Sequence, residues 1–165
     1  MKKVFCFFVV FLAVSSAFLC AQAPKLSLSG GAFFANYIDG GGAADFGFLL
    51  FNKNSLDIRN HFVLRGAGFD GGGLLSLAEK VSVGMLEEDK FRSYGYIEGG
   101  IGIWGDKNKD FLERPLAYTF GGGGGTDIFL REGFSIYFEA GALIYILDNN
   151  WKSGGVFQIG WKSYF

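Results

Sequence analysis

The chain has 165 residues, enough for one domain with a sizeable core. Its composition is 50% hydrophobic and 18% aromatic, with 27 glycines and 2 prolines, a combination that is rare in soluble domains. The formal net charge is -1, so there is no polybasic arm that would bind nucleic acid. The composition therefore leaves a membrane, another protein or no partner at all as the expected binding partner.

Residues 1–23 have the layout of a secretory signal peptide. Two lysines open the segment, an apolar run extends to Cys20, and Ala21-Gln22-Ala23 resembles a small-residue cleavage site. Because Pro24 disfavours cleavage directly after Ala23, cleavage after Ala21 is an alternative. A retained anchor helix is the other interpretation, although the apolar run is short for it. We expect a mature domain over residues 24–165.

Both cysteines, Cys6 and Cys20, lie in this first segment. The mature chain is therefore expected to contain no disulfide and no thiolate metal site. Lipidation of Cys20 is an alternative, which residues 17–19 fit poorly because a small residue is wanted directly before the cysteine.

After residue 24 no stretch reaches the ~20 apolar residues that a membrane-spanning helix needs. The pattern has a period of two instead, as in residues 134–146, where Ser135, Tyr137 and Glu139 alternate with Phe and Ile. Backbone inside lipid must satisfy its own hydrogen bonds, so a spanning chain without helices has to close into a barrel.

Breaks rich in Gly, Asn and Asp divide the mature chain into eight predicted strands. Their spans are 25–38, 43–52, 56–68, 74–86, 91–104, 115–130, 134–147 and 154–165. We therefore predict an all-β fold, an eight-stranded antiparallel up-and-down transmembrane barrel. The even strand number places both termini on one side, expected to be the periplasm. The external loops are then 39–42, 70–73, 105–114 and 148–153.

Two details test this division into strands. The run Gly121–Gly125 is placed inside the sixth strand, where glycine would thin a crowded lumen; a flexible linker is the alternative. Glu79 shares the outward parity of Leu75 and Leu77. A lipid-facing Glu near mid-strand would cost on the order of 2 kcal/mol. Either a bulge changes the phase of this strand, or Glu79 lies near a membrane interface.

The end of the chain repeats the alternation up to its last residue. Phe157, Ile159, Trp161 and Phe165 supply apolar or aromatic side chains at alternate positions, and Ser163 departs from the pattern. With the signal peptide and the eight strands, this resembles the small outer-membrane barrels of the OmpA transmembrane domain and OmpX type, whose C-terminal assembly signal ends in an aromatic residue. The resemblance concerns architecture and covers the mature chain. It implies the outer membrane of a diderm bacterium, with outer-membrane lipids and the barrel-assembly machinery as partners.

The inward parity carries charges of both signs. An eight-stranded barrel has an interior just wide enough for side chains, so we expect a packed network of ion pairs in the lumen. A proton or ion path is the alternative. The predicted lumen charges are Asp57, Arg59, Arg65, Lys80, Arg92, Glu98, Asp127, Glu139 and Lys162.

Aromatic residues near strand ends predict belts at the two membrane interfaces. The expected members are Tyr37, Trp104, Tyr118, Tyr145 and Trp151 at the external side, and Phe91, Tyr164 and Phe165 at the periplasmic side.

Catalysis has little support in the sequence. Some eight-stranded barrels modify lipid A with a His, a Ser and an acid, but His61 is the single histidine, and Arg59 and Val63 are its neighbours at a spacing of two. We expect no enzyme activity, no cofactor, and no metal or nucleotide site, because the Gly-rich runs and acidic loops lack the required spacing.

The longest predicted loop mixes both charges in Asp106, Lys107, Lys109 and Asp110. Binding residues concentrate in loops on rigid scaffolds, so this loop is the candidate contact with an unidentified host or matrix ligand. We expect a structural or surface-interaction protein, with a narrow solute channel and a lipid-anchored or soluble periplasmic β-domain as alternatives.

Overall fold

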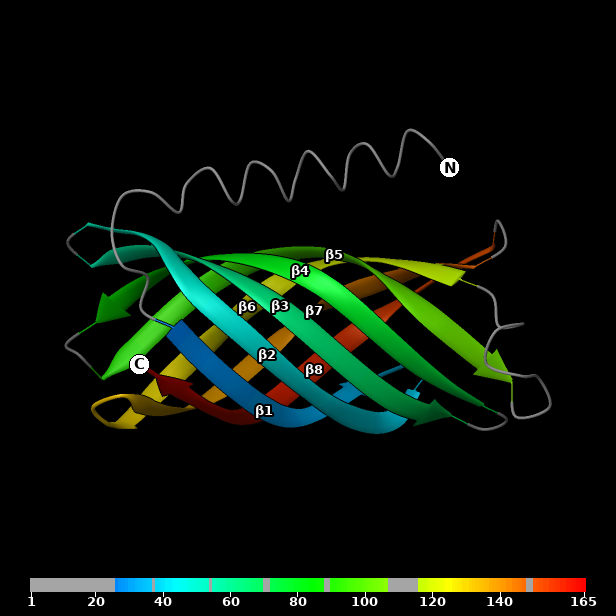
Figure 1. Cartoon of the computed structure of the whole chain (residues 1–165), viewed down its shortest axis with the longest axis horizontal. Helices are drawn as coiled ribbons and strands as arrows, with labels where there is room; N and C mark the ends of the chain where they lie inside the picture. The colour runs from blue at the N-terminus through cyan, green and yellow to red at the C-terminus, as the bar shows by residue number, and fades with distance from the viewer. Residues whose placement is uncertain are drawn as a thin grey trace.

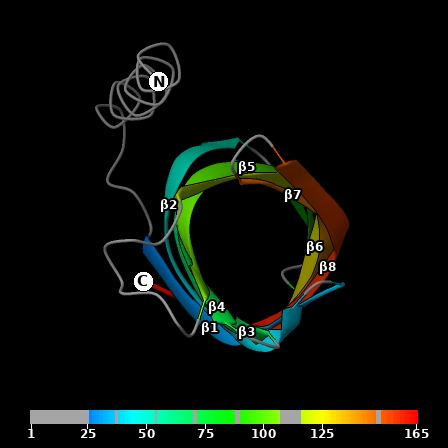
Figure 2. The ribbon, with the colours of Figure 1, turned by 90° about the vertical axis from the view of Figure 1, so that its right-hand side faces the viewer.

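The structure is a closed barrel of eight strands (Figures 1 and 2). It is a computed structural model, and it describes residues 26–36, 38–53, 55–69, 72–87, 90–106, 116–147 and 150–165. The strands are β1 (Leu26–Ala35), β2 (Ile38–Lys53), β3 (Leu56–Phe69), β4 (Gly72–Glu87), β5 (Phe91–Asp106), β6 (Leu116–Arg131), β7 (Phe134–Leu147) and β8 (Asn150–Tyr164).

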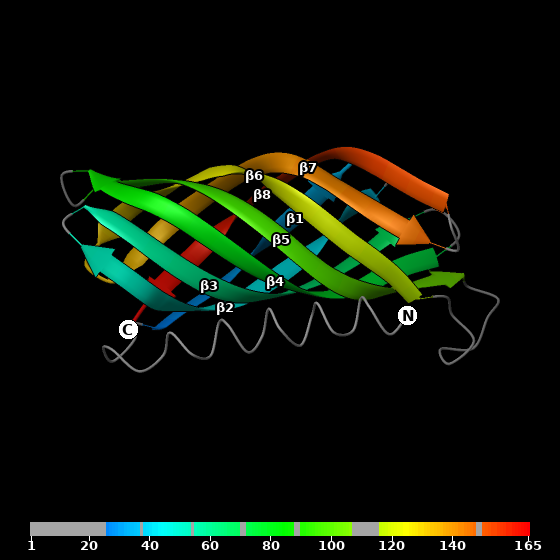
Figure 3. The same cartoon turned by 90° about the horizontal axis from the view of Figure 1, so that it is seen from above.

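Every strand pairs antiparallel with its neighbours in the sequence, and β8 pairs with β1 to close the barrel. The strands run obliquely around the barrel axis (Figure 3). At the seam, the backbone N–H of Leu26 donates to Phe165 at 3.1 Å and that of Phe165 donates to Leu26 at 2.8 Å. The predicted fold class and strand number are confirmed. We call the end of the barrel where Leu26 and Phe165 meet the terminal end, and the opposite end the loop end.

Several strands extend beyond their predicted bounds. Residues 39–42, predicted as an external loop, belong to β2, and residues 150–153 belong to β8. Gly41 pairs with both Phe33 of β1 and Ala67 of β3, so hydrogen bonds to two neighbouring strands outweigh the low strand propensity of glycine. The predicted loop residue Asp106 is the last residue of β5. Residues 1–25, with the predicted signal peptide, and Lys107, Lys109 and Asp110 lie outside the described residues.

The outer wall carries the large apolar side chains of one parity. In β4, Leu75 and Leu77 are 46% and 50% exposed, and Ile97 of the adjacent β5 is 65% exposed. Such a surface is unfavourable in water and favourable in lipid. The described residues contain no helix long and apolar enough to cross a membrane.

Glycines let neighbouring strands approach closely. Gly121–Gly125 lie within β6, as predicted, and a Cβ on Gly123 would collide with the backbone of Ala140 and Gly141 on β7. In the β6–β7 turn, Gly133 has φ 75°, a conformation that L side chains rarely adopt. Glycines therefore allow neighbouring strands of the barrel wall to approach closely, and they also allow the backbone conformation of a turn.

We expect Gly123→Ala to lower the free energy of unfolding by about 1–3 kcal/mol, because its Cβ would overpack against β7. Gly95→Ala is the matched control, since a Cβ there meets its nearest atom, the carbonyl oxygen of Gly123, at an ordinary 3.8 Å. Urea unfolding of the refolded barrel, followed by tryptophan fluorescence, measures both. Equal stability of the two variants would contradict the packing argument.

Candidate functional site: the charged lumen

The structure places all nine predicted lumen charges inside the barrel, each 8% exposed or less. They are joined by Asp45 of β2, which is 2% exposed and was not among the predicted residues. The buried lumen of the described residues thus holds five cationic side chains and five carboxylates, with His61 among them. Along β3, which runs from the terminal end to the loop end, Asp57 and Arg59 come first, His61 follows and Arg65 comes last.

An apolar cluster fills the lumen toward the loop end. Phe33, Leu74, Leu143, Tyr145 and Val156 pack together there, each 9% exposed or less. Directly beside it, the guanidinium of Arg65 donates two hydrogen bonds to Glu98, at 2.9 and 2.7 Å, and lies 5.4 Å from the centroid of the Phe33 ring. A bidentate pair of this kind is geometrically specific.

The central cluster consists of Asp45, His61, Lys80 and Glu139. The Lys80 ammonium donates to Glu139 at 2.8 Å and to Asp45 at 3.4 Å. Tyr94 donates its hydroxyl hydrogen to the same Glu139 oxygen at 2.9 Å. One cation therefore links carboxylates from β2 and β7 across the barrel.

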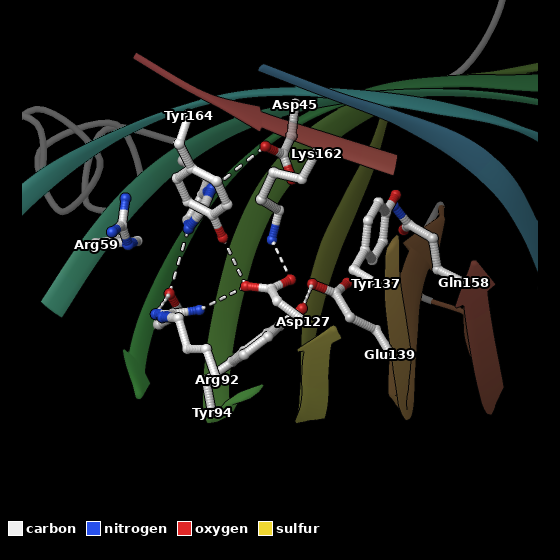
Figure 4. A network of polar contacts seen from close by, with 12 residues as sticks. Asp45, Arg59, Arg92, Tyr94, Asp127, Tyr137, Glu139, Gln158, Lys162 and Tyr164 are labelled. Carbon is white, nitrogen blue, oxygen red and sulfur yellow. Dashed lines mark hydrogen bonds and ion pairs between the residues drawn. The ribbon is translucent and has the colours of Figure 1, made fainter. Parts of the chain in front are cut away.

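The terminal cluster consists of Asp57, Arg59, Arg92, Asp127 and Lys162, of which Figure 4 labels the last four. Arg92 pairs with Asp57 at 2.7 Å and with Asp127 at 3.3 Å. Lys162 also pairs with Asp127, at 3.0 Å. The Tyr164 hydroxyl donates a hydrogen bond to the Asp127 carboxylate at 2.6 Å. Arg59 pairs with Asp57 through its Nε at 2.9 Å. Strands β3, β5, β6 and β8 contribute to this cluster.

The formal charges of the clusters do not balance one by one. The Arg65–Glu98 pair is neutral, and the central cluster has two carboxylates for one lysine when His61 is neutral. The terminal cluster has three cations for two carboxylates. The lumen as a whole is neutral, but its terminal part carries one excess positive charge.

Ser82, which sequence spacing did not connect with His61, lies beside it in the folded chain. The Nδ1 of His61 is 3.3 Å from Asp45 and its Nε2 is 3.2 Å from the Ser82 hydroxyl. With the proton on Nδ1, this is the hydrogen-bond order of a Ser–His–Asp triad. Ser82 is 0% exposed, however, and the Arg92 guanidinium also donates to its hydroxyl, at 3.2 Å. A substrate carbonyl would have to displace Arg92 to reach it.

Glu79 is neither displaced by a bulge nor near a strand end. The β4 register with β3 and β5 is continuous, and Glu79 lies at mid-strand with only 3% exposure. On the same outward parity, the side-chain amide of Asn60 donates to the Glu79 carboxylate at 2.7 Å. Phe48 and Phe62, whose rings are 6.2 Å apart, are the strand partners of Asn60 and Glu79. Both predicted explanations were wrong: a hydrogen-bonded pair beside two aromatic rings accommodates the acid.

Three residues predicted for the aromatic belts, Tyr145, Tyr164 and Trp104, lie on the lumen side instead. Tyr145 is 4% exposed in the apolar cluster, and Tyr164 reaches inward to Asp127. Trp104 packs edge-on against Tyr145, with ring centroids 5.9 Å apart. Trp151 and Phe165, at 72% and 73% exposure, do lie outside. Tyr145 has the same parity as Tyr137 and Glu139 in the period-two pattern of β7. This parity already indicates that its side chain faces the lumen.

A cavity of about 690 Å³ opens at the terminal end. Asp57, Arg59 and Arg92 line its inner part, and Tyr164 and Arg131 line its wall. The described residues contain no group of His, Cys, Asp or Glu side chains that would hold a metal ion.

The comparison with solved structures matches this architecture, whereas no protein-family profile and no curated protein matches the sequence. Ail, the attachment invasion locus protein of Yersinia pestis, superposes with a TM-score of 0.56 at 14% identity, over 87% of this chain and 100% of that one. The chain has the fold of the small eight-stranded outer-membrane β-barrels.

Two further outer-membrane barrels support the same conclusion. Neisserial surface protein A matches with a TM-score of 0.55 at 11% identity, over 87% of this chain and 98% of that one. The N-terminal barrel domain of Pseudomonas aeruginosa OprF matches with a TM-score of 0.53 at 16% identity, over 87% and 100%. The predicted resemblance to outer-membrane barrels is confirmed at the level of the fold.

We expect Arg65→Met to destabilise this outer-membrane barrel by about 3–5 kcal/mol, because it leaves the Glu98 carboxylate buried without its cation. Adding Glu98→Gln should restore part of the loss, since the uncompensated charge is then gone. Urea unfolding of the two single variants and the double variant measures the coupling. Strictly additive losses would show that the pair does not couple.

Proposed function

We propose that the chain is a closed, non-catalytic barrel of the outer membrane, which supports the membrane structurally and presents its loops at the surface. The observation that carries the proposal is the filled lumen. The apolar cluster and the Arg65–Glu98 pair obstruct the loop end, and the central cluster bridges the barrel behind them.

The filled lumen argues against the alternative of a solute channel. A conducting path would require the Arg65–Glu98 pair to separate and the Phe33, Leu143 and Tyr145 side chains to move together. Separating a buried ion pair leaves two uncompensated charges in a water-poor interior, which is costly. We propose the closed state as the functional one.

The same burial supports the absence of catalysis. The Ser82–His61–Asp45 order suits acyl transfer, but Arg92 and Lys80 occupy the other faces of Ser82 and Asp45. These contacts make the three residues members of the ion-pair network. We therefore assign Ser82 a structural role, as the hydrogen-bond link between the central and the terminal clusters.

The proposed contact surface is the loop end. Residues 107–115, which join β5 to β6, form the longest connection there. Ail, which has the same fold, has been crystallised with the heparin analogue sucrose octasulfate, in a form that matches this chain with a TM-score of 0.53 and 16% identity. That ligand is a reasonable first probe for a surface role, because the fold alone assigns no ligand.

We expect the refolded wild-type barrel to give no steady single-channel conductance in a planar bilayer. Replacing Phe33, Leu143 and Tyr145 together by Ala should leave the barrel closed, and conductance is expected only when Arg65, Glu98, Lys80 and Glu139 are replaced by Ala as well, because both ion pairs also obstruct the lumen. The control is Leu64→Ala, which removes an outward apolar side chain that is 48% exposed. Steady conductance of the wild type would overturn the closed-barrel proposal.

We expect replacement of residues 107–115 by a short Gly-Ser turn to abolish retention of the barrel on a heparin matrix, while the mobility shift between cold and boiled gel samples persists. The barrel wall does not depend on this connection, since β5 and β6 pair along their length. The control is a variant in which the β4–β5 turn, at the terminal end, is replaced by the same Gly-Ser turn. Unchanged retention after the first exchange would exclude this loop as the contact surface.

A further inference from the structure

The cavity at the terminal end has an inner wall of positive character. Its volume of about 690 Å³ lies within the usual range for small-molecule sites. Among the described residues, its charged lining side chains are three cations, Arg59, Arg92 and Arg131, and two carboxylates, Asp57 and Glu132, and Asn52 and Ser55 add side chains that can donate hydrogen bonds. The adjoining terminal cluster carries the one excess positive charge described above.

Arg59 uses little of its hydrogen-bonding capacity. Its Nε donates to Asp57 at 2.9 Å, and its Cζ lies over the Tyr164 ring, 4.8 Å from the ring centroid. Its Nη1 is buried and has no hydrogen-bond partner in the described part of the chain. A guanidinium presents five N–H donors in a fixed fork, and a buried donor without an acceptor costs free energy.

The carboxylates nearby are already occupied. Asp57 accepts from both Arg59 and Arg92, and Asp127 accepts from Arg92, Lys162 and Tyr164. Neither acid can neutralise Arg59 further without giving up another cation. At the rim, Arg131 lies 5.6 Å from the centroid of the Phe134 ring, and Glu132 is its neighbour in the turn. The excess charge therefore belongs to the inner wall.

We propose that the terminal cavity binds a compact oxyanion, a carboxylate or phosphate group, through the Nη edge of Arg59. Contact with the Tyr164 ring and the bond to Asp57 hold the guanidinium, so the unpartnered Nη1 donor is in place before the anion arrives, and the anion has to displace a lining side chain to reach this buried atom. A planar fork of two N–H donors matches two oxygens of a carboxylate or phosphate. Asn52 and Ser55 supply neutral donors from the β2–β3 end of the cavity wall.

The test is a titration of the ¹⁵N-labelled barrel, refolded in detergent micelles, with N-acetylglycine in one arm and inorganic phosphate in the other. Sodium chloride at equal ionic strength is the reference for plain screening. We expect a saturable shift of the Arg59 Nε–H resonance and of the backbone amides of Asp57 and Gly133. Saturation by only one of the two probes assigns the site to the carboxylate or to the phosphate class.

Arg59→Gln should weaken binding about tenfold or more, because it removes a charge-assisted hydrogen bond worth at least about 1.5 kcal/mol. Asp57 keeps its Arg92 partner in this variant. The matched control is Lys152→Gln, which removes one exposed positive charge at the loop end and should leave the affinity unchanged. The mobility shift between cold and boiled samples verifies that each variant has folded.

Three results would overturn the proposal: no saturation with either probe, shifts equal to those in chloride, or full affinity in Arg59→Gln. If Arg59→Gln does not fold, Arg131→Gln is measured in its place. The Arg131 side chain is exposed and lines the cavity outside the buried network. A severalfold weaker affinity in that variant supports the site, and an unchanged affinity rejects it.

Discussion

Closure of eight strands into one barrel is the constraint on which the rest of the structure depends. A ring of this size leaves an interior only wide enough for side chains, so each inward position has to fill space without crowding its neighbours. Glycines such as Gly100, Gly123 and Gly160 meet this requirement where adjacent backbones approach closely. Large polar side chains pack directly against glycines as well, Arg92 against Gly84 and Tyr137 against Gly160.

Large polar side chains in a narrow interior must satisfy one another. Each carboxylate of the buried lumen accepts from at least one cation, and Asp57, Asp45 and Asp127 accept from more than one partner. Such connected networks are favourable when they are complete, and a partly satisfied network is costly. The same requirement explains Asn60 and Glu79, where an outward acid is tolerated because a neighbouring strand provides its donor. The lumen is thus a polar core, with the apolar exterior turned toward lipid.

Much of this could be predicted from the sequence, since the period of two determines which side chains face inward. The alternation placed Arg65, Glu98 and Glu139 in the lumen and Leu77 and Ile97 outside, without any tertiary information. Strand ends were less predictable. Glycines 40–42 suggested a loop, yet cross-strand hydrogen bonds keep them in β2. Pairings between strands, such as Ser82 of β4 with His61 of β3 or Arg92 of β5 with Asp57 of β3, depend on strand register and tilt, which local sequence does not specify.

The join between β1 and β8 has a consequence for how the barrel forms. Lys162 and Tyr164 of β8 meet Asp127 of β6, and Lys80 of β4 meets Asp45 of β2 and Glu139 of β7. In an open sheet these strands lie two or three positions apart, roughly 10–14 Å, and the curvature of the barrel wall brings their inward side chains together. The contact between Arg59 of β3 and the Tyr164 ring of β8 spans the join itself, so the polar network of the lumen is completed only when the barrel has closed. Partly assembled sheets would then be disfavoured within the bilayer, and insertion would behave as a cooperative event.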